Sequence, residues 1–145
     1  MIQSIINGII KAIRTEYDKS HRIYTESVEQ GLKEPCFIIR CLNPSGEREI
    51  SNRFKRYYPF MITYIPSTTE PIAECNDVCE NLLTLLYDIG TDIGVLHAFD
   101  TPSGEIVDGN LQFSVQYQLF AHKYEQPVDG MDELVTVDTN VRKGD

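Results

Sequence analysis

The sequence LQFSVQYQLF, residues 111–120, alternates apolar and polar side chains more regularly than any other stretch of the chain. A two-residue period predicts a β-strand with one face on the core and the other face turned away from it. The apolar set should be buried: Leu111, Phe113, Val115, Tyr117 and Leu119. The sequence leaves open whether the opposite face meets solvent, another protein or a lumen that must not grip DNA; it carries Gln112, Ser114, Gln116, Gln118 and Phe120.

The strand that contains residues 111–120 should cover 106–124. A further strand is predicted before it, over 93–100, and a turn at Thr101-Pro102-Ser103-Gly104 should join the two. The pair Asp108-Gly109 also has turn composition.

The first half of the chain predicts three more strands. Residues 36–42 are nearly all apolar, which suits a central strand covered on both faces. The turn signal Asn43-Pro44-Ser45-Gly46 should lead to a long returning strand over 49–65, in which Pro59 indicates a bulge, a bend or an edge position. A short strand is expected over 23–28.

Two segments have the three-to-four-residue period of amphipathic helices. The first covers 2–19, and the second follows Ser67, which has capping-box spacing to Glu70, and runs through Ile89 to Gly90 as a C-terminal cap. The helix stripes and strand faces together predict these buried residues: Ile6, Ile9, Ile13, Phe37, Ile39, Leu82, Leu86, Phe113, Val115 and Tyr117.

These elements predict an α+β fold with an antiparallel or mixed sheet of about five strands and two amphipathic helices, in the order α-β-β-β-α-β-β. Residues 1–126 should form the domain, and 127–145 an extended, acidic C-terminal arm. The arm contains residues of high strand propensity, namely Leu134, Val135, Thr136, Val137 and Val141. We expect it either to add as a strand to an exposed sheet edge of a partner or neighbouring copy, or to be a disordered tail.

Composition excludes some classes of function. The chain has 145 residues and a formal net charge of −9, the reverse of the balance typical of nucleic-acid-binding proteins. No apolar run approaches the roughly 20 residues that span a bilayer, so we expect no membrane segment and a cytoplasmic protein. We therefore expect neither a membrane nor a sequence-specific nucleic acid among its partners.

The sequence contains no constellation that indicates catalysis, a cofactor or a metal. Four cysteines could in principle bind zinc, but Cys36 and Cys41 should point to opposite faces of a strand, and Cys75 and Cys79 share a helix stripe. We expect buried, reduced thiols and no enzymatic activity.

One basic cluster is a candidate protein–protein contact: Arg48, Arg53, Lys55 and Arg56. In that role it would meet an acidic surface of a partner or neighbouring copy. The cluster lies beside Tyr57 and Tyr58, so single-stranded nucleic acid could also stack there. A third interpretation is that these cations simply occupy the solvated face of a strand.

Residues 23–66 resemble small tail terminator proteins of contractile-tailed phages, prophages and phage-derived bacteriocin particles of Gram-positive bacteria. The resemblance rests on Ile23-Tyr24, Gln30-Gly31, Pro35-Cys36-Phe37 and Arg56-Tyr57-Tyr58-Pro59-Phe60, together with the order of the two helices. It extends over roughly residues 1–125.

The resemblance implies a structural collar protein that assembles as a ring, as a homohexamer, on the head-proximal end of a tail tube and sheath, and so ends polymerisation. It implies tube and sheath proteins as partners, with neck proteins as further candidates. It also implies assembly in the bacterial host cytoplasm and a final place in a phage or phage-tail-like particle. A neck or tail-completion protein of the same fold stays open, as does an unrelated cytosolic binding domain or enzyme.

Overall fold

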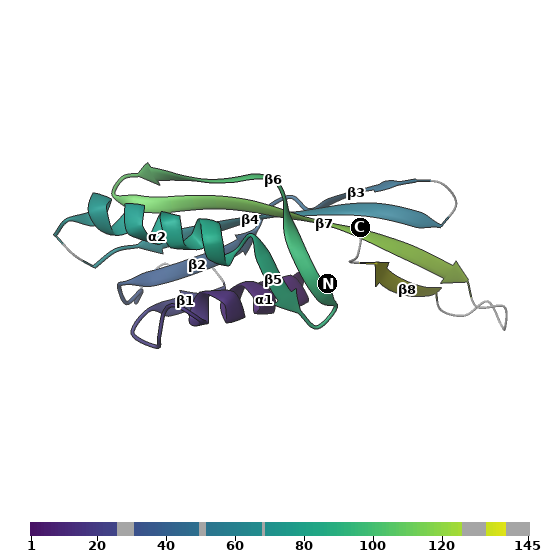
Figure 1. Ribbon diagram of the computed structural model, residues 1–145, viewed down its shortest axis with the longest axis horizontal. Coiled ribbons are helices and arrows are strands. Elements are labelled where there is room, and N and C mark those ends of the chain that lie inside the picture. Colours follow the sequence, from purple (N-terminus) through teal and green to yellow (C-terminus); the bar gives the residue numbers. More distant parts are fainter. Residues whose placement is uncertain (26–30, 50–51, 68, 126–132, 139–145) are drawn as a thin grey trace.

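The computed structural model describes residues 1–25, 31–49, 52–67, 69–125 and 133–138, and it confirms an α+β fold (Figure 1). The first part of the chain forms α1 (Ile2–Arg14), β1 (Arg22–Tyr24), β2 (Cys36–Cys41), β3 (Ser45–Arg48) and β4 (Arg53–Ile65). The second part forms α2 (Pro71–Leu85), β5 (Asp88–Thr91), β6 (Gly94–Val107), β7 (Asn110–Glu125) and β8 (Glu133–Asp138). The sheet therefore has three short strands, β3, β5 and β8, beyond the five that the sequence predicts.

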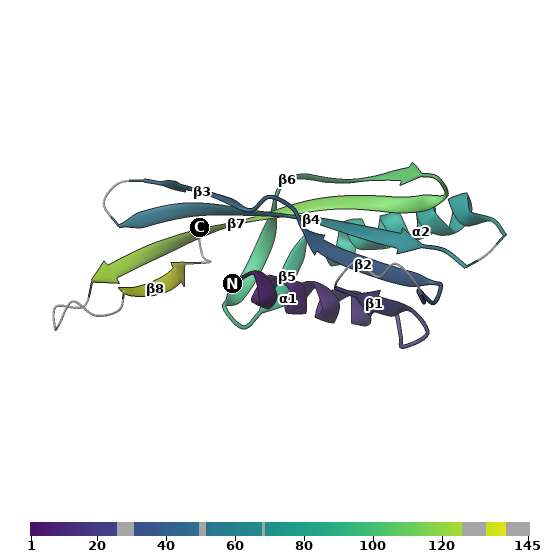
Figure 2. The ribbon, with the colours of Figure 1, turned by 180° about the vertical axis from the view of Figure 1, so that it is seen from behind.

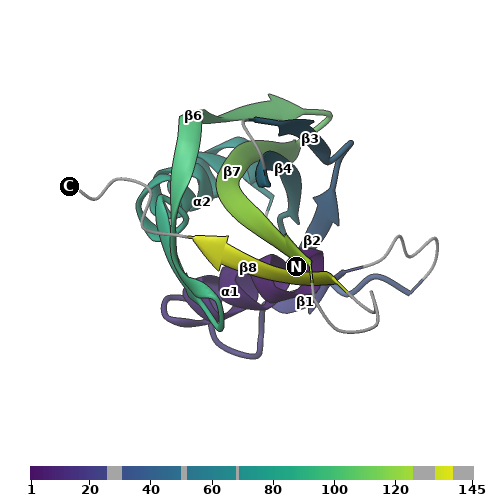
Figure 3. The same cartoon turned by 90° about the vertical axis from the view of Figure 1, so that its right-hand side faces the viewer.

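The strands form one mixed sheet in the order β1-β2-β4-β7-β6-β5, with β3 on β4 and β8 on β7. Strands β1 and β2 are parallel, and the remaining pairs among the described residues are antiparallel. Seen from behind, β1 and β2 lie next to α1 (Figure 2). Viewed along the long axis, the sheet curves from β2 through β4 and β7 to β6 and partly encloses α2 (Figure 3).

The ladder between β4 and β7 organises the sheet. Its antiparallel register runs without interruption from Arg53↔His122 to Tyr64↔Leu111. The predicted alternation along 111–119 is confirmed, because all five apolar side chains are buried. Phe120, which lies on the polar side, is also buried.

Both helices pack on the same side of the sheet and close one core. The isoleucine stripe of α1 contributes Ile5, Ile9 and Ile13, and α2 contributes Val78 and Leu82, all of which belong to one buried cluster with the strand residues. All ten residues predicted to be buried are buried.

Two glycines allow the helices to approach the strands closely. A Cβ at Gly8 of α1 would lie 2.7 Å from Cγ2 of Thr91 and 3.0 Å from the carbonyl oxygen of Gly90. A Cβ at Gly104 of β6 would lie 2.6 Å from Sγ of Cys79 on α2. Each glycine therefore sets the spacing between a helix and a strand.

The predicted turn at 101–104 is wrong. Strand β6 continues through it, with a register shift between Phe99 and Ser103 that accommodates Asp100 at φ 68°. The chain reverses instead at Asp108-Gly109, where φ is 53° and 80°, as a two-residue hairpin turn requires. A proline and a glycine in 101–104 thus mark a bulge rather than a turn.

The limits of α2 also differ from the prediction. The helix begins after Glu70, which makes no side-chain capping bond, so the expected capping box with Ser67 is not formed. It ends at Leu85, and Ile89 and Gly90 belong to β5. Because β5 pairs with β6, the apolar residue Ile89 reaches the core from a strand rather than from the helix.

The other boundaries shift modestly. Helix α1 ends at Arg14 rather than residue 19, and residues 26–28 of the predicted first strand lie outside the described residues. The expected long strand begins at Arg53, because part of the predicted turn pairs with it as β3. Strand β2 is covered on its core face, whereas its other face is covered only in part, since Cys36 is buried and Arg40 is exposed.

Pro59 lies inside the sheet, at the point where one edge of β4 changes partners. Strand β3 pairs with β4 up to Tyr57, and β2 pairs from Phe60 onward. The carbonyl of Pro59 accepts a hydrogen bond from the amide of Leu42 at 2.8 Å, so the side of the residue that lacks an N–H faces this junction. Proline cannot donate the return bond to Leu42, but this place is the end of the β2–β4 ladder, and the β4–β7 ladder on the opposite edge is unaffected, which explains how a central strand tolerates proline.

Candidate protein–protein interface

The basic cluster lies where the sheet extends beyond the ends of both helices (Figures 1 and 2). We call this part the extension; it comprises β3 (Ser45–Arg48), residues 53–57 of β4, residues 118–125 of β7, and β8 (Glu133–Asp138). The strand period separates the cations, because residue 55 pairs with Phe120 on the outer face and residue 56 with Leu119 on the core face. The sequence predicted one patch, but the structure divides it between two faces.

Arg53 and Lys55 share the outer face and surround one carboxylate and one ring. Nε of Arg53 lies 3.6 Å from Glu49, and Nζ of Lys55 lies 3.3 Å from the same carboxylate. The guanidinium of Arg53 sits 4.0 Å from the ring centroid of Phe120, and Nζ of Lys55 lies 5.5 Å from it. The hydrogen bond to Glu49 raises the pKa of Lys55. Both cations are therefore already engaged within the chain.

Arg48 and Arg56 lie on the other face of the β3–β4 hairpin. Register places Arg48 opposite Phe54 and Gly46 opposite Arg56, and cross-strand partners share a face. Arg48 and Phe54 thus stand beside Arg56 on one side of the hairpin. Phe54 is a further candidate that was not predicted from the sequence, since Arg48 comes to lie opposite it only through the register of the hairpin.

The polar row of β7 belongs to a wider uncharged face. Gln112, Ser114, Gln116 and Gln118 pair in register with Thr63, Met61, Pro59 and Tyr57 of β4, and none of the eight is charged. The hydroxyl of Thr63 donates to the side-chain oxygen of Gln112 at 3.2 Å. The ring of Tyr57 packs against Phe99 of β6 at a centroid distance of 5.6 Å. Phe99 is a functional candidate that was not predicted from the sequence, and Tyr57 was considered only for nucleic-acid stacking, because the contact between the two rings depends on the pairing of three strands.

The C-terminal arm forms a strand. Residues Glu133 to Asp138 pair antiparallel with Phe120 to Glu125 of β7 in the same chain. This pairing includes four of the candidate contact residues, Leu134, Val135, Thr136 and Val137, whereas Val141 lies outside the described residues. The strand propensity of the arm is thus expressed at an edge of the chain's own sheet.

Comparison with known families identifies the chain. A sequence-family model described as phage tail terminator protein matches residues 4–129. The chain belongs to the phage tail terminator family. No curated protein matches it at significant similarity.

The match confirms the resemblance found in the sequence and gives the terminator its general role as a structural protein of an assembled phage tail, in contact with other tail proteins. No helix in the described part of the terminator is long and apolar enough to cross a membrane. Among the same residues, no group of three or more His, Cys, Asp or Glu side chains is arranged to hold a metal ion.

The cysteines of the terminator are free thiols. Cys36 and Cys75 are buried, and Cys41 and Cys79 are half-buried. Burial raises the pKa of all four thiols, which disfavours the reactive thiolate form.

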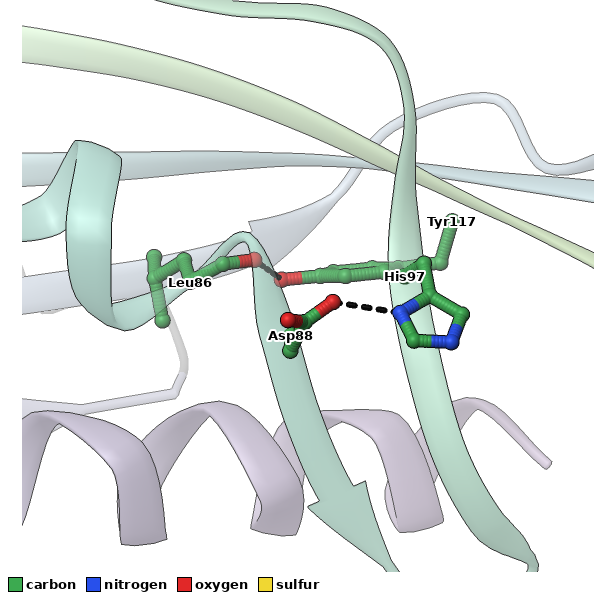
Figure 4. A network of polar contacts seen from close by, with 4 residues as sticks. All are labelled: Leu86, Asp88, His97 and Tyr117. Carbon is green, nitrogen blue, oxygen red and sulfur yellow. Dashed lines mark hydrogen bonds and ion pairs between the residues drawn. The ribbon is translucent and has the colours of Figure 1, made fainter.

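Buried tyrosines join the helix layer to the sheet. The hydroxyl of Tyr117 donates to the carbonyl oxygen of Leu86 at 2.6 Å, which satisfies a carbonyl at the end of α2 (Figure 4). Burial raises the pKa of Tyr117 above its ordinary range. Nearby, the exposed pair Asp88 and His97 links β5 to β6. The bond from Tyr117 thus ties the end of α2 to strand β7 of the terminator.

Proposed function

We propose that the protein forms a ring, as a homohexamer, that caps the head-proximal end of a contractile tail tube and sheath and so ends polymerisation. The observation that carries this proposal is the extension, which holds cations on two faces and lies at the end of the molecule away from α2. A ring needs heterologous contacts, in which one patch of a subunit binds a different patch of the next. A projecting charged hairpin on an otherwise acidic chain is suited to such a contact.

The uncharged outer face is suited to a second contact. The centre of a protein–protein interface typically contains few charged residues and many aromatic residues and methionines. The uncharged outer face has this composition, since it carries Tyr57, Phe99 and Met61. We assign this face to stacking on tail proteins and the basic hairpin to ring neighbours or the tube. Collar assembly then takes place in the host cytoplasm and requires neither a reaction nor a cofactor.

Electron microscopy of the purified protein mixed with its tube protein tests the proposal. We expect ring-shaped density on one end of each tube and a defined tube length. Binding along the sides of tubes, or a monomer that leaves tube ends bare and growing, contradicts it.

We further propose that residues 1–126 form the terminator domain and that 127–145 act as an arm. In this proposal Leu134 to Val141 gives up its pairing with β7 of its own chain and adds as a strand to a sheath subunit or an adjacent copy, with backbone hydrogen bonds giving most of the affinity. Truncation after Gln126 should leave a folded protein that no longer holds the sheath or its ring neighbour, measured by co-sedimentation with assembled sheaths. Full co-sedimentation of the truncated protein would show that the arm has no such role.

A further inference from the structure

Lysine and arginine are unevenly distributed along the chain. Residues 57–122 contain nine acidic residues and no lysine or arginine. These residues include all of α2, β5 and β6. The β3–β4 hairpin, by contrast, carries the four cations of the basic cluster. The segment that forms α2, β5 and β6 therefore carries no lysine or arginine, whereas the hairpin carries four.

The exposed side of α2 combines apolar and acidic groups. Ile72 and Leu83 are 60% and 40% exposed, and they lie on one stripe because they are separated by about three helical turns. Tyr87, directly after the helix, is 52% exposed. The exposed carboxylate of Glu80 lies one turn before Leu83, next to this stripe, and that of Asp77 lies one turn before Glu80, farther round the exposed side of the helix. Three large apolar side chains in a row are unusual on a surface that faces only water.

The stripe lies on the side of α2 that faces a free strand edge. Cys79, within the same stripe, packs against Gly104 of β6. From Ser103 to Val107, β6 pairs with β7 along one edge, and no described residue pairs with its other edge. Val107 at the end of this edge is also exposed. We call the combination of the α2 stripe and this free edge the α2–β6 surface.

The hairpin has the opposite chemistry. On one of its faces the aromatic ring of Phe54 lies in register with Arg48 and next to Arg56. Among the described residues, Arg56 makes no ion pair. On the other face of the hairpin, the carboxylate of Glu49 contacts Arg53 and Lys55. The face that carries Phe54 thus presents an apolar centre flanked by arginines.

We propose that the α2–β6 surface of one copy binds the β3–β4 hairpin of a second copy. Phe54 then packs on Ile72 and Leu83, while the guanidinium group of Arg56 approaches Glu80. Apolar contact supplies affinity, and the charges set orientation and partner choice. The inference rests on the proposed ring and specifies which surfaces join its subunits.

The positions of the two surfaces require the contact to be intermolecular. The hairpin lies at the end of the molecule away from α2, so it cannot reach that helix in its own chain (Figure 1). Because the two surfaces differ, the contact is head-to-tail and repeats from copy to copy until a ring closes.

Exchange of charge between the two surfaces tests the inference. We expect Glu80→Arg and Arg56→Glu each to weaken self-association by about tenfold or more, and the double variant to recover most of it, as for directly paired sites. Sedimentation velocity at low and high salt measures this, and the single-variant losses should be largest at low salt. Glu16→Arg reverses an exposed carboxylate next to α1 as the matched control and should associate like the wild type. Absence of rescue in a folded double variant overturns the direct pairing.

Cross-linking supplies an independent measurement that does not depend on charge. A photoreactive residue at position 83, in a mixture of isotopically labelled and unlabelled chains with tubes present, should cross-link to residues 45–56 of a second copy. Cross-links to other segments, or none between copies, overturn the inference. If both charge-reversal variants still form rings that cap tubes normally, only this docking is overturned. If copies cross-link as expected but never cap a tube, only the terminator role is overturned.

Discussion

Strands β4 and β7 pass through two regions of the molecule that use the same ladder differently. In the helix-covered region, Tyr58, Phe60, Ile62 and Tyr64 point into the core and are buried. In the extension the same face of β4 carries Phe54 and Arg56, which are only half-buried. The pairing with β7 is continuous across the boundary.

The difference teaches that strand period and burial are separate properties. The period assigns each side chain to a face, and it does so equally in both regions. Burial depends on what covers the face, and both helices stop short of the extension. Stability should therefore reside in the helix-covered region, and interaction chemistry in the extension.

The largest loss of stability is expected from Leu86→Ala. Leu86 is fully buried at the end of α2, so its truncation should lower the free energy of unfolding by about 2–5 kcal/mol. Urea unfolding followed by circular dichroism measures the change. Thr84→Ala on the exposed side of the same helix is the control. Equal losses of stability in the two variants would show that the stability does not depend on the buried face of the helix.

A somewhat smaller loss is expected from Gly8→Ala. Alanine favours an isolated helix by about 1 kcal/mol, but here its methyl group collides with β5, and overpacking typically costs about 1–3 kcal/mol. We expect net destabilisation in thermal unfolding. Asn7→Ala, at an exposed position of the same turn, should not destabilise, and a more stable Gly8→Ala variant would show that α1 can move away from β5.

Tyr117→Phe tests the polar link between the sheet and α2. Loss of the hydroxyl leaves the carbonyl of Leu86 without its partner and should cost about 1–3 kcal/mol. Because the folded-state pKa of Tyr117 is raised, the wild type should lose stability as pH rises above about 10. The free energy of unfolding of the variant should fall less over the same pH range, as measured by denaturant unfolding at several pH values. An identical fall in the wild type and the variant would show that Tyr117 does not cause the loss of stability at high pH.

The smallest effect is expected in the extension, from Glu49→Gln. The ion pairs with Arg53 and Lys55 lie at a partly exposed surface, where such pairs contribute little. The midpoint of urea unfolding should not shift resolvably, at low or high salt. A clear shift would show that the extension contributes to the stability of the core.

The prediction from sequence was most successful where periodicity was long. The alternation along 111–120 and the isoleucine stripe of α1 identified their buried faces because tertiary packing followed the period. Residues 101–104 and 89–90 were misassigned for a common reason. Glycine and proline interrupt a period locally, and only the pairing partner decides whether the interruption is a turn, a bulge or a cap.

The candidate interface was predicted only as a set of neighbouring cations. Sequence proximity grouped Arg53 with Arg56, but the pleat sends them to opposite faces. The contribution of Phe120, Phe99 and Glu49 depends on strand pairing and chain reversal, which no local pattern encodes. The exposed stripe on α2 was equally hidden, because its leucine and isoleucine had the same periodicity as core residues.

The uninterrupted ladder from Arg53↔His122 to Tyr64↔Leu111 also has a mechanical consequence. Bending the extension relative to the core would strain several adjacent interstrand hydrogen bonds at once. Pro59 does not weaken this ladder, because its missing N–H faces the opposite edge of β4. Strands β4 and β7 therefore couple the hairpin rigidly to the helix-covered region. A force applied to the hairpin should rotate the whole subunit rather than bend the extension.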